Sequence, residues 1–113
     1  MEENTRDWQK IKDLILDITG KEASVEAILF LIGQREFGGL KRNFTKEEKV
    51  TLMDIALKRI MSITGYYKKV GIDKKGFPVW EKIKDFQEMN PFDQELLIRN
   101  HIIEYFKQEG LIQ

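Results

Sequence analysis

The fold is decided by the stretch Ala27-Ile28-Leu29-Phe30-Leu31-Ile32, in which every residue is apolar. A helix with apolar residues all round is buried on more than one side, so we expect a central helix here. Ser24 can begin it by accepting a main-chain N–H of the first turn, and the helix is predicted to run to about Phe37. Gly33 lies inside this helix at a cost of about 1 kcal/mol relative to alanine. It indicates close packing of a neighbouring element or, alternatively, a gap that faces a ligand.

Three further helices are predicted on either side of the central one. The first spans about residues 6–19 and ends at Gly20, with an apolar stripe formed by Trp8, Ile11, Leu14, Ile15 and Ile18. The third spans about 46–64, because Thr45 and Glu48 have the spacing of a capping box. The last spans about 91–109, where Asn90 caps the helix and Pro91 takes its first position.

The segment 66–81 has a different composition. Tyr66, Tyr67, Val70 and Ile72 favour extended structure, and Asp73 to Gly76 has the residue preferences of a type I turn. We expect a short β-hairpin, with an irregular aromatic loop as the alternative. Pro78 cannot donate to a strand ladder and needs an edge or unpaired position. The side chains expected to hold the segment against the helices are Tyr67, Phe77 and Trp80.

With 113 residues the chain has the length of one domain, residues 1–113. The predicted fold class is all-α or mostly α, with four helices around one core and the hairpin or aromatic loop between the third and fourth. The acidic, polar start lacks the pattern of a secretory signal, no apolar run is long enough to cross a bilayer, and there is no cysteine. We therefore expect a soluble cytoplasmic protein without disulfides or membrane contact.

The formal net charge is zero, which argues against a polycation of the histone type. The charges are nevertheless partitioned along the chain. Residues 41–84 carry twelve basic and five acidic side chains, whereas residues 85–113 carry two basic and six acidic ones. Complementary charge within one molecule or across a dimer is one interpretation, and a basic centre that faces a polyanion is the other.

Catalytic and metal-binding chemistry is not indicated. A nucleophile with its base has few candidates in a chain with no cysteine and one histidine, His101, for which we expect a structural role. His101 and Glu104 lack the further acidic residues of a helical metal centre. Residues 38–42, Gly-Gly-Leu-Lys-Arg, lack the features of a phosphate-binding loop and are predicted to be a helix cap followed by a surface loop. We expect no enzyme activity, no cofactor and no metal.

Aromatic and basic residues alternate in the centre of the chain, which suggests a nucleic-acid patch. Aromatic rings can stack on bases while lysines neutralise phosphates. Three helices followed by a basic hairpin also resemble a winged-helix arrangement, although helix 46–64 offers an outward face of mixed sign. The alternative is that the rings are core and the lysine tips are solvated. The candidate residues are Lys68, Lys69, Lys74, Lys75, Tyr66, Tyr67 and Trp80.

Two further hypotheses concern binding. The leading one is a non-catalytic protein-interaction or structural module, either a homodimer or a subunit of a small complex, because the second and fourth helices carry more apolar surface than a small bundle needs. The other is a small-ligand or enzyme site built from Tyr66, Tyr67, Glu36 and Arg35.

Several segments of the chain resemble a family of small, mostly helical bacterial proteins of uncharacterised function. The most specific are Gly65-Tyr66-Tyr67 and the pattern Asp73-x-x-Gly76-x-Pro78-x-Trp80, and the resemblance covers about residues 25–106. It implies a compact helical fold and assigns no catalytic residues.

Overall fold

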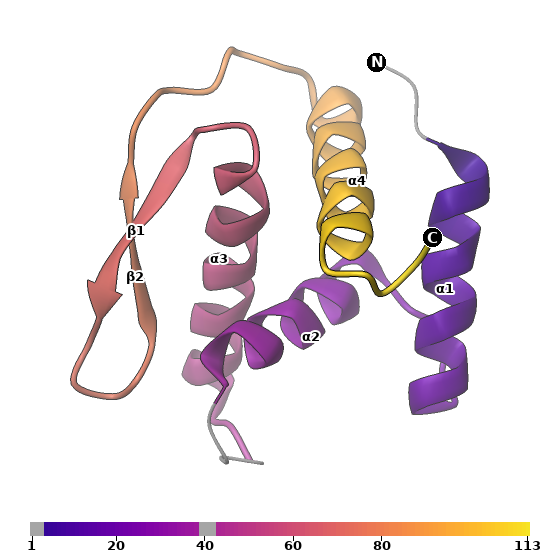
Figure 1. Cartoon of the computed structure of the whole chain (residues 1–113), viewed down its shortest axis with the longest axis horizontal. Coiled ribbons are helices and arrows are strands. Elements are labelled where there is room, and N and C mark those ends of the chain that lie inside the picture. Colours follow the sequence, from indigo (N-terminus) through magenta and orange to yellow (C-terminus); the bar gives the residue numbers. More distant parts are fainter. Residues whose placement is uncertain (1–3, 39–42) are drawn as a thin grey trace.

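The computed structural model describes residues 4–38 and 43–113. This part of the chain forms α1 (Thr5–Thr19), α2 (Val25–Phe37), α3 (Lys46–Ser62), β1 (Tyr67–Ile72), β2 (Pro78–Lys82) and α4 (Pro91–Gln108). In Figure 1 the hairpin lies along one side of α3, α4 lies between α3 and α1, and α2 crosses α3. The prediction of four helices with a hairpin between the third and fourth is confirmed. The two strands make the fold mixed rather than purely helical, and the irregular-loop alternative is wrong.

Side-chain caps define where each helix begins. Ser24 accepts the Ala27 N–H, and Asn90 accepts the Asp93 N–H at 2.8 Å. Thr45 and Glu48 form the predicted capping box, with bonds of 3.1 and 2.9 Å. The sequence interpretation missed a fourth cap, Asn4, which starts α1 at residue 5.

Helix ends agree with the predictions to within two residues. Gly20 and Gly38 end α1 and α2 with φ values of +73° and +67°, a conformation that other residues rarely adopt. Gly38 thus confirms the predicted helix cap, while the surface loop predicted for 39–42 lies outside the described residues. The third helix ends at Ser62 instead of residue 64, because a turn over Ile63 to Gly65 follows it.

Gly33 sits where α2 crosses α3. A Cβ atom at this position would overlap the carbonyl oxygen of Leu52 and lie only 2.9 Å from the Leu52 Cβ. Close packing of a neighbouring element is therefore confirmed, and the alternative of a ligand-facing gap is wrong.

The core consists of two clusters that share α2 and α3. The larger one draws on all four helices and includes Ile11, Ile28, Ile60 and Ile102, each fully buried. The smaller one lies under the hairpin and is centred on Leu52, Ile55 and Phe77, with Phe30, Phe37, Phe44 and Trp80 around it. The predicted central helix contributes to both clusters, as expected of a helix buried on more than one side.

The hairpin is antiparallel, pairing Tyr67 with Lys82 and Lys69 with Trp80, and an irregularity at Val70 shifts the register. Asp73 fixes its turn: one carboxylate oxygen accepts the N–H groups of Lys75 and Phe77, both at 2.9 Å. Phe77 is buried, and Tyr67 and Trp80 are partly buried, so the predicted aromatic anchoring is confirmed. Pro78 opens the second strand of a two-stranded sheet, where every strand is an edge.

The chain end packs back on the helices. Ile112 lies against the larger cluster, and Lys10 of α1 donates to the Gln113 carbonyl at 2.9 Å. Within residues 4–38 and 43–113, no helix combines the length and the hydropathy needed to cross a bilayer.

Candidate functional site

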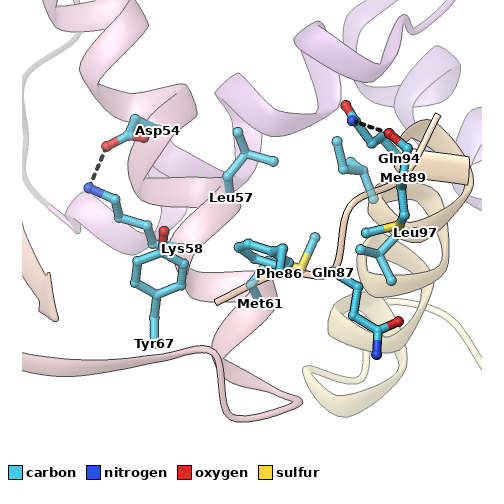
Figure 2. A pocket seen from close by; sticks show the side chains of 11 residues that line it. Asp54, Leu57, Lys58, Met61, Tyr67, Phe86, Gln87, Met89, Gln94 and Leu97 are labelled. Atoms are coloured by element: carbon cyan, nitrogen blue, oxygen red, sulfur yellow. Dashed lines mark hydrogen bonds and ion pairs between the residues drawn. The ribbon is translucent and has the colours of Figure 1, made fainter. Parts of the chain in front are cut away.

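A concave groove of about 360 Å³ opens between α3, α4, the start of β1 and the linker that precedes α4 (Figure 2). Hydrocarbon, thioether and aromatic groups make up most of its lining. These apolar residues are Leu57, Met61, Phe86, Met89, Leu97 and Ile98. Small-molecule and side-chain binding sites commonly have this size and apolar character. We call this feature the groove.

The spacing of apolar residues on two helices builds the walls of the groove. Leu57 and Met61 are four residues apart on α3, and Leu97 and Ile98 come from the second turn of α4. Met61 and Leu97 are buried in the larger core cluster, whereas Leu57 and Ile98 are only partly buried beside it. The groove is thus a gap in the packing of α3 against α4, with part of the core as its floor.

The linker that closes one end of the groove is held by specific contacts. The ring of Phe86 stacks on Tyr66 with centroids 4.2 Å apart and planes 11° apart. The Gln94 amide donates to the Met89 carbonyl at 2.9 Å, as drawn in Figure 2. Phe86 and Met89, two of the three linker residues in the lining, are therefore held by contacts before any ligand arrives.

Polar groups lie around the rim of the groove. Asp54 and Lys58 form an i,i+4 ion pair at 2.8 Å, and Lys58 lies 6.0 Å from the centre of the Tyr67 ring. The side chains of Asp54 and Lys58 are 56% and 32% exposed. Exposed ion pairs of this kind contribute little to stability, so a bound ligand can displace this pair at small cost. Gln87 and Gln94 are exposed rim residues, and the Gln94 amide nitrogen already donates to the Met89 carbonyl.

Charge changes sign across this region. Residues 58–84, from α3 through the hairpin, carry eight basic and two acidic side chains, whereas residues 85–98 carry four acidic and no basic ones. The boundary is marked by an ion pair of 2.7 Å between Lys82 and Asp85. The hydrogen bond between them lowers the pKa of Asp85 and raises that of Lys82.

The tyrosines of the predicted nucleic-acid patch are used in packing. The Phe86 ring is stacked on the Tyr66 ring, and the Lys84 ammonium lies 4.3 Å from the centre of the Tyr66 ring. Tyr67 lines the groove. The Tyr66 ring is thus already in contact with Phe86 and Lys84, whereas the Tyr67 ring borders the groove.

The other members of that patch lie on different parts of the hairpin. Trp80 packs against the smaller core cluster, and its buried Nε1 has no hydrogen-bond partner. Lys68 and Lys69 are exposed on β1, whereas Lys74 and Lys75 are exposed in the turn. Lys69 is the cross-strand partner of Trp80, so the structure does not separate all of the lysines from the rings. The rings are packed and the lysine tips are exposed, an arrangement closer to the alternative of core rings with solvated lysine tips.

Arg35 and Glu36, which we had grouped with Tyr66 and Tyr67, lie elsewhere. Glu36 accepts from Arg59 Nε at 3.1 Å and from the Tyr105 hydroxyl at 2.7 Å. On α3, Lys58 faces Tyr67 while the next residue, Arg59, faces Glu36, and consecutive helical residues point about 100° apart. The grouping of these four residues in one site is therefore wrong.

Tyr105 is the central residue of this second polar cluster, and the sequence interpretation did not single it out. Arg35 donates to the Tyr105 hydroxyl at 2.9 Å and also pairs with Glu109. Burial, together with the hydrogen bond to Glu36, raises the pKa of Tyr105 to about 12. A hydroxyl that stays protonated and donates to a carboxylate joins α2 to α4, which is a structural role.

His101 is buried and both of its ring nitrogens are engaged. Nδ1 donates to the Leu97 carbonyl at 2.8 Å, and Nε2 lies 2.8 Å from the Thr64 hydroxyl, from which it accepts in this tautomer. These contacts agree with the predicted structural role. In the described ranges, no three His, Asp or Glu side chains come together in a way that could hold a metal ion.

Comparisons of the chain with protein-family models, with curated proteins and with solved structures find no match. The resemblance to a family of small helical bacterial proteins stays a prediction that rests on the motifs.

Proposed function

We propose that the chain is a non-catalytic protein-interaction module whose groove takes a bulky apolar side chain of a partner protein. The observation that carries the proposal is the groove itself, which has a volume of about 360 Å³, a mostly apolar lining and a polar, exposed rim. Protein interfaces draw most of their binding energy from a few aromatic or aliphatic anchors buried in such pockets and surrounded by polar contacts. We also propose a cytoplasmic location, which the lack of cysteine favours.

The chemistry of the lining supports binding over reaction. The six apolar lining residues can exclude water from a bound ring, but they cannot transfer a proton. At the rim, the carboxylate of Asp54 is already paired with Lys58. The contacts that hold Phe86 and Met89 reduce the ordering cost of binding, because the pocket exists before the partner arrives.

A side-chain analogue tests the proposal directly. We expect N-acetylphenylalanine amide to shift the amide resonances of Leu57, Met61 and Leu97 saturably in two-dimensional NMR, and N-acetylalanine amide to leave them unchanged. Leu57→Asp places a charge in the groove and abolishes the shifts, whereas Val50→Asp, at a 63% exposed position of the same helix, does not. A titration without saturable shifts at the groove would contradict the proposal.

A nucleic-acid-binding regulator is the second candidate, favoured by one observation. Among the described residues, no acidic group lies within 4.0 Å of the ammonium groups of Lys68, Lys69, Lys74 or Lys75. Replacing all four by alanine would then abolish binding to duplex or single-stranded DNA. Binding that keeps its affinity as salt rises would exclude this role, because phosphate contacts release counterions.

A further inference from the structure

We infer that the partner is a second copy of this chain, and that each copy of a two-fold dimer places its Phe92 in the groove of the other. This inference rests on the proposed function of the groove and names its occupant. It starts from the exposure of Phe92, a residue that is 73% exposed, the highest value among the large apolar residues that the structure describes.

Phe92 is presented by the capped first turn of α4. It lies in the first turn of α4, directly after Pro91, and the Asn90 side chain caps that turn through the Asp93 N–H. The hollow beside it, formed with Glu95, Leu96 and Arg99, has a volume of only about 60 Å³ and is too small to enclose a phenyl ring. An exposed aromatic ring on a capped helix turn, without a pocket of its own, is a suitable anchor for a partner's pocket.

Phe92 lies on α4, the helix that also supplies one wall of the groove, which suits a two-fold arrangement. Ile98, which lines the groove, comes six residues after Phe92 on α4. It therefore lies about 9 Å from Phe92 along the helix axis and is rotated by about 120° around that axis. The ring of Phe92 therefore points away from the groove of its own chain. In a two-fold dimer the same patch serves on both sides, so each copy donates one ring and receives one.

Charge complementarity favours a second copy over an unrelated partner. In the sequence Phe92 is flanked by Glu88, Asp93 and Glu95. Arg99 also borders Phe92 and pairs with Glu95, so these four charged residues carry a net charge of about −2. On the α3 side of the groove Lys58 is in the lining, paired with Asp54, and the basic stretch that begins there includes Lys84, which lies over the Tyr66 ring. A Phe92 that enters the groove of another copy brings its acidic neighbours toward these lysines, and the two-fold axis repeats the contact.

The mass of the chain in solution tests the inference. We expect sedimentation to show a monomer at low micromolar concentration and a dimer toward millimolar concentration, with weaker association at high salt. Phe92→Ala should raise the dimer dissociation constant by about tenfold or more. Ile18→Ala, at a 67% exposed position of α1, serves as the matched control and should change nothing. A monomer at every concentration, or a Phe92→Ala dimer as tight as the wild type, would overturn the inference.

A mixing experiment tests whether Phe92 and the groove meet. A Phe92→Ala chain keeps its groove, and a Leu57→Asp chain keeps its Phe92, so each variant alone has lost both contacts of the dimer. An equimolar mixture restores one of the two contacts and should associate more tightly than either variant alone, provided that both melt cooperatively. If Leu57→Asp does not fold, Gln94→Trp, at an exposed rim position, replaces it. A mixture that associates no better than its components contradicts the inference.

The two proposals fail in different ways. If the groove of the Phe92→Ala chain binds N-acetylphenylalanine amide while the wild type stays monomeric, the second copy is wrong and the groove serves another protein. If the groove binds no aromatic probe in the Phe92→Ala chain, the proposed function and the dimer are both wrong.

Discussion

Gly33 of α2 packs directly against the main chain of Leu52 of α3, and this contact sets how closely the two helices approach. Leu52 is fully buried and belongs to the core cluster under the hairpin, while α2 also faces the larger cluster on its other side. The absence of a side chain at one position of an otherwise apolar helix thus lets both clusters form around the same pair of helices.

The first prediction concerns this contact. We expect Gly33→Ala to lower the free energy of unfolding by about 2 kcal/mol or more, because overpacking against main-chain atoms outweighs the gain of about 1 kcal/mol in helix propensity. Gly71→Ala is the control, since a Cβ there meets nothing within 4 Å. Urea unfolding of both variants measures the difference. Equal stability of Gly33→Ala and the wild type would show that α2 can move away from Leu52 without loss.

A second prediction concerns the hairpin, which depends on Phe77. This residue is 6% exposed and lies on Leu52 and Ile55 of α3, with the Phe37 ring 4.9 Å away. We expect Phe77→Ala to cost about 3–5 kcal/mol, as truncations of buried phenylalanines do. Val79→Ala, at a 40% exposed position two residues later, should cost much less. Thermal melts that differ by only a degree or two would mean that the hairpin is peripheral to stability.

Local signals in the sequence were sufficient for most of the secondary structure. Each cap depends on residues three apart, so Thr45 with Glu48 and Asn90 with Asp93 could be identified without knowing the fold. The same spacing relates Asn4 to Asp7, and applying the rule there would have found the start of α1. The sequence left two interpretations of the segment 66–81, a hairpin or an irregular loop. The hairpin is stabilised by contacts between Phe77 and α3, and residues so far apart in the sequence give no local signal of contact.

The groove and the polar cluster could not be predicted in the same way. Four segments contribute to the groove, and no spacing within one helix shows that Leu57 will lie opposite Leu97. Likewise, Glu36 is 69 residues from Tyr105 in the chain, and the pairing follows only once α2 and α4 are placed. The exposure of Phe92 could not be predicted either, because nothing in the apolar pattern of α4 distinguishes it from Phe106, which is buried.

A third prediction concerns the attachment of α1 to α4. Asp7 has a side chain only 7% exposed, and its carboxylate lies 2.7 Å from the Lys107 ammonium. The hydrogen bond from Lys107 lowers the pKa of Asp7 below its ordinary value of 3.8. Folding therefore favours the ionised form of Asp7. Its contribution to the free energy of unfolding is fully present above the pKa of Asp7 in the unfolded chain, and it is lost as pH falls through the lower pKa of Asp7 in the folded chain. We expect Asp7→Asn to be less stable than the wild type at neutral pH and to approach it in acid.

The control for this prediction is Asp13→Asn, at an exposed position of the same helix whose carboxylate accepts from Gln9. Unfolding curves between neutral and acidic pH should show a gap for Asp7→Asn that closes and no comparable trend for Asp13→Asn. A gap that stays constant with pH would assign the loss to packing and not to the charge of Asp7.

The last prediction concerns Tyr105, whose hydroxyl lies between Glu36 and Arg35. Tyr105→Phe leaves a partly buried carboxylate without one of its donors, so we expect a loss of about 1–2 kcal/mol at neutral pH. The pKa of Tyr105 is raised from 10.0 to about 12, so the unfolded chain loses this proton first as pH rises. The stabilisation is then complete below about pH 10 and disappears as pH rises toward 12, and the difference in free energy of unfolding between wild type and Tyr105→Phe should shrink over that interval.

The control is Tyr66→Phe, which also loses a hydroxyl but whose ring is held by stacking on Phe86, and it should show no such change. A Tyr105→Phe difference that is unchanged across this alkaline range would mean that the hydroxyl does not hold its proton for Glu36.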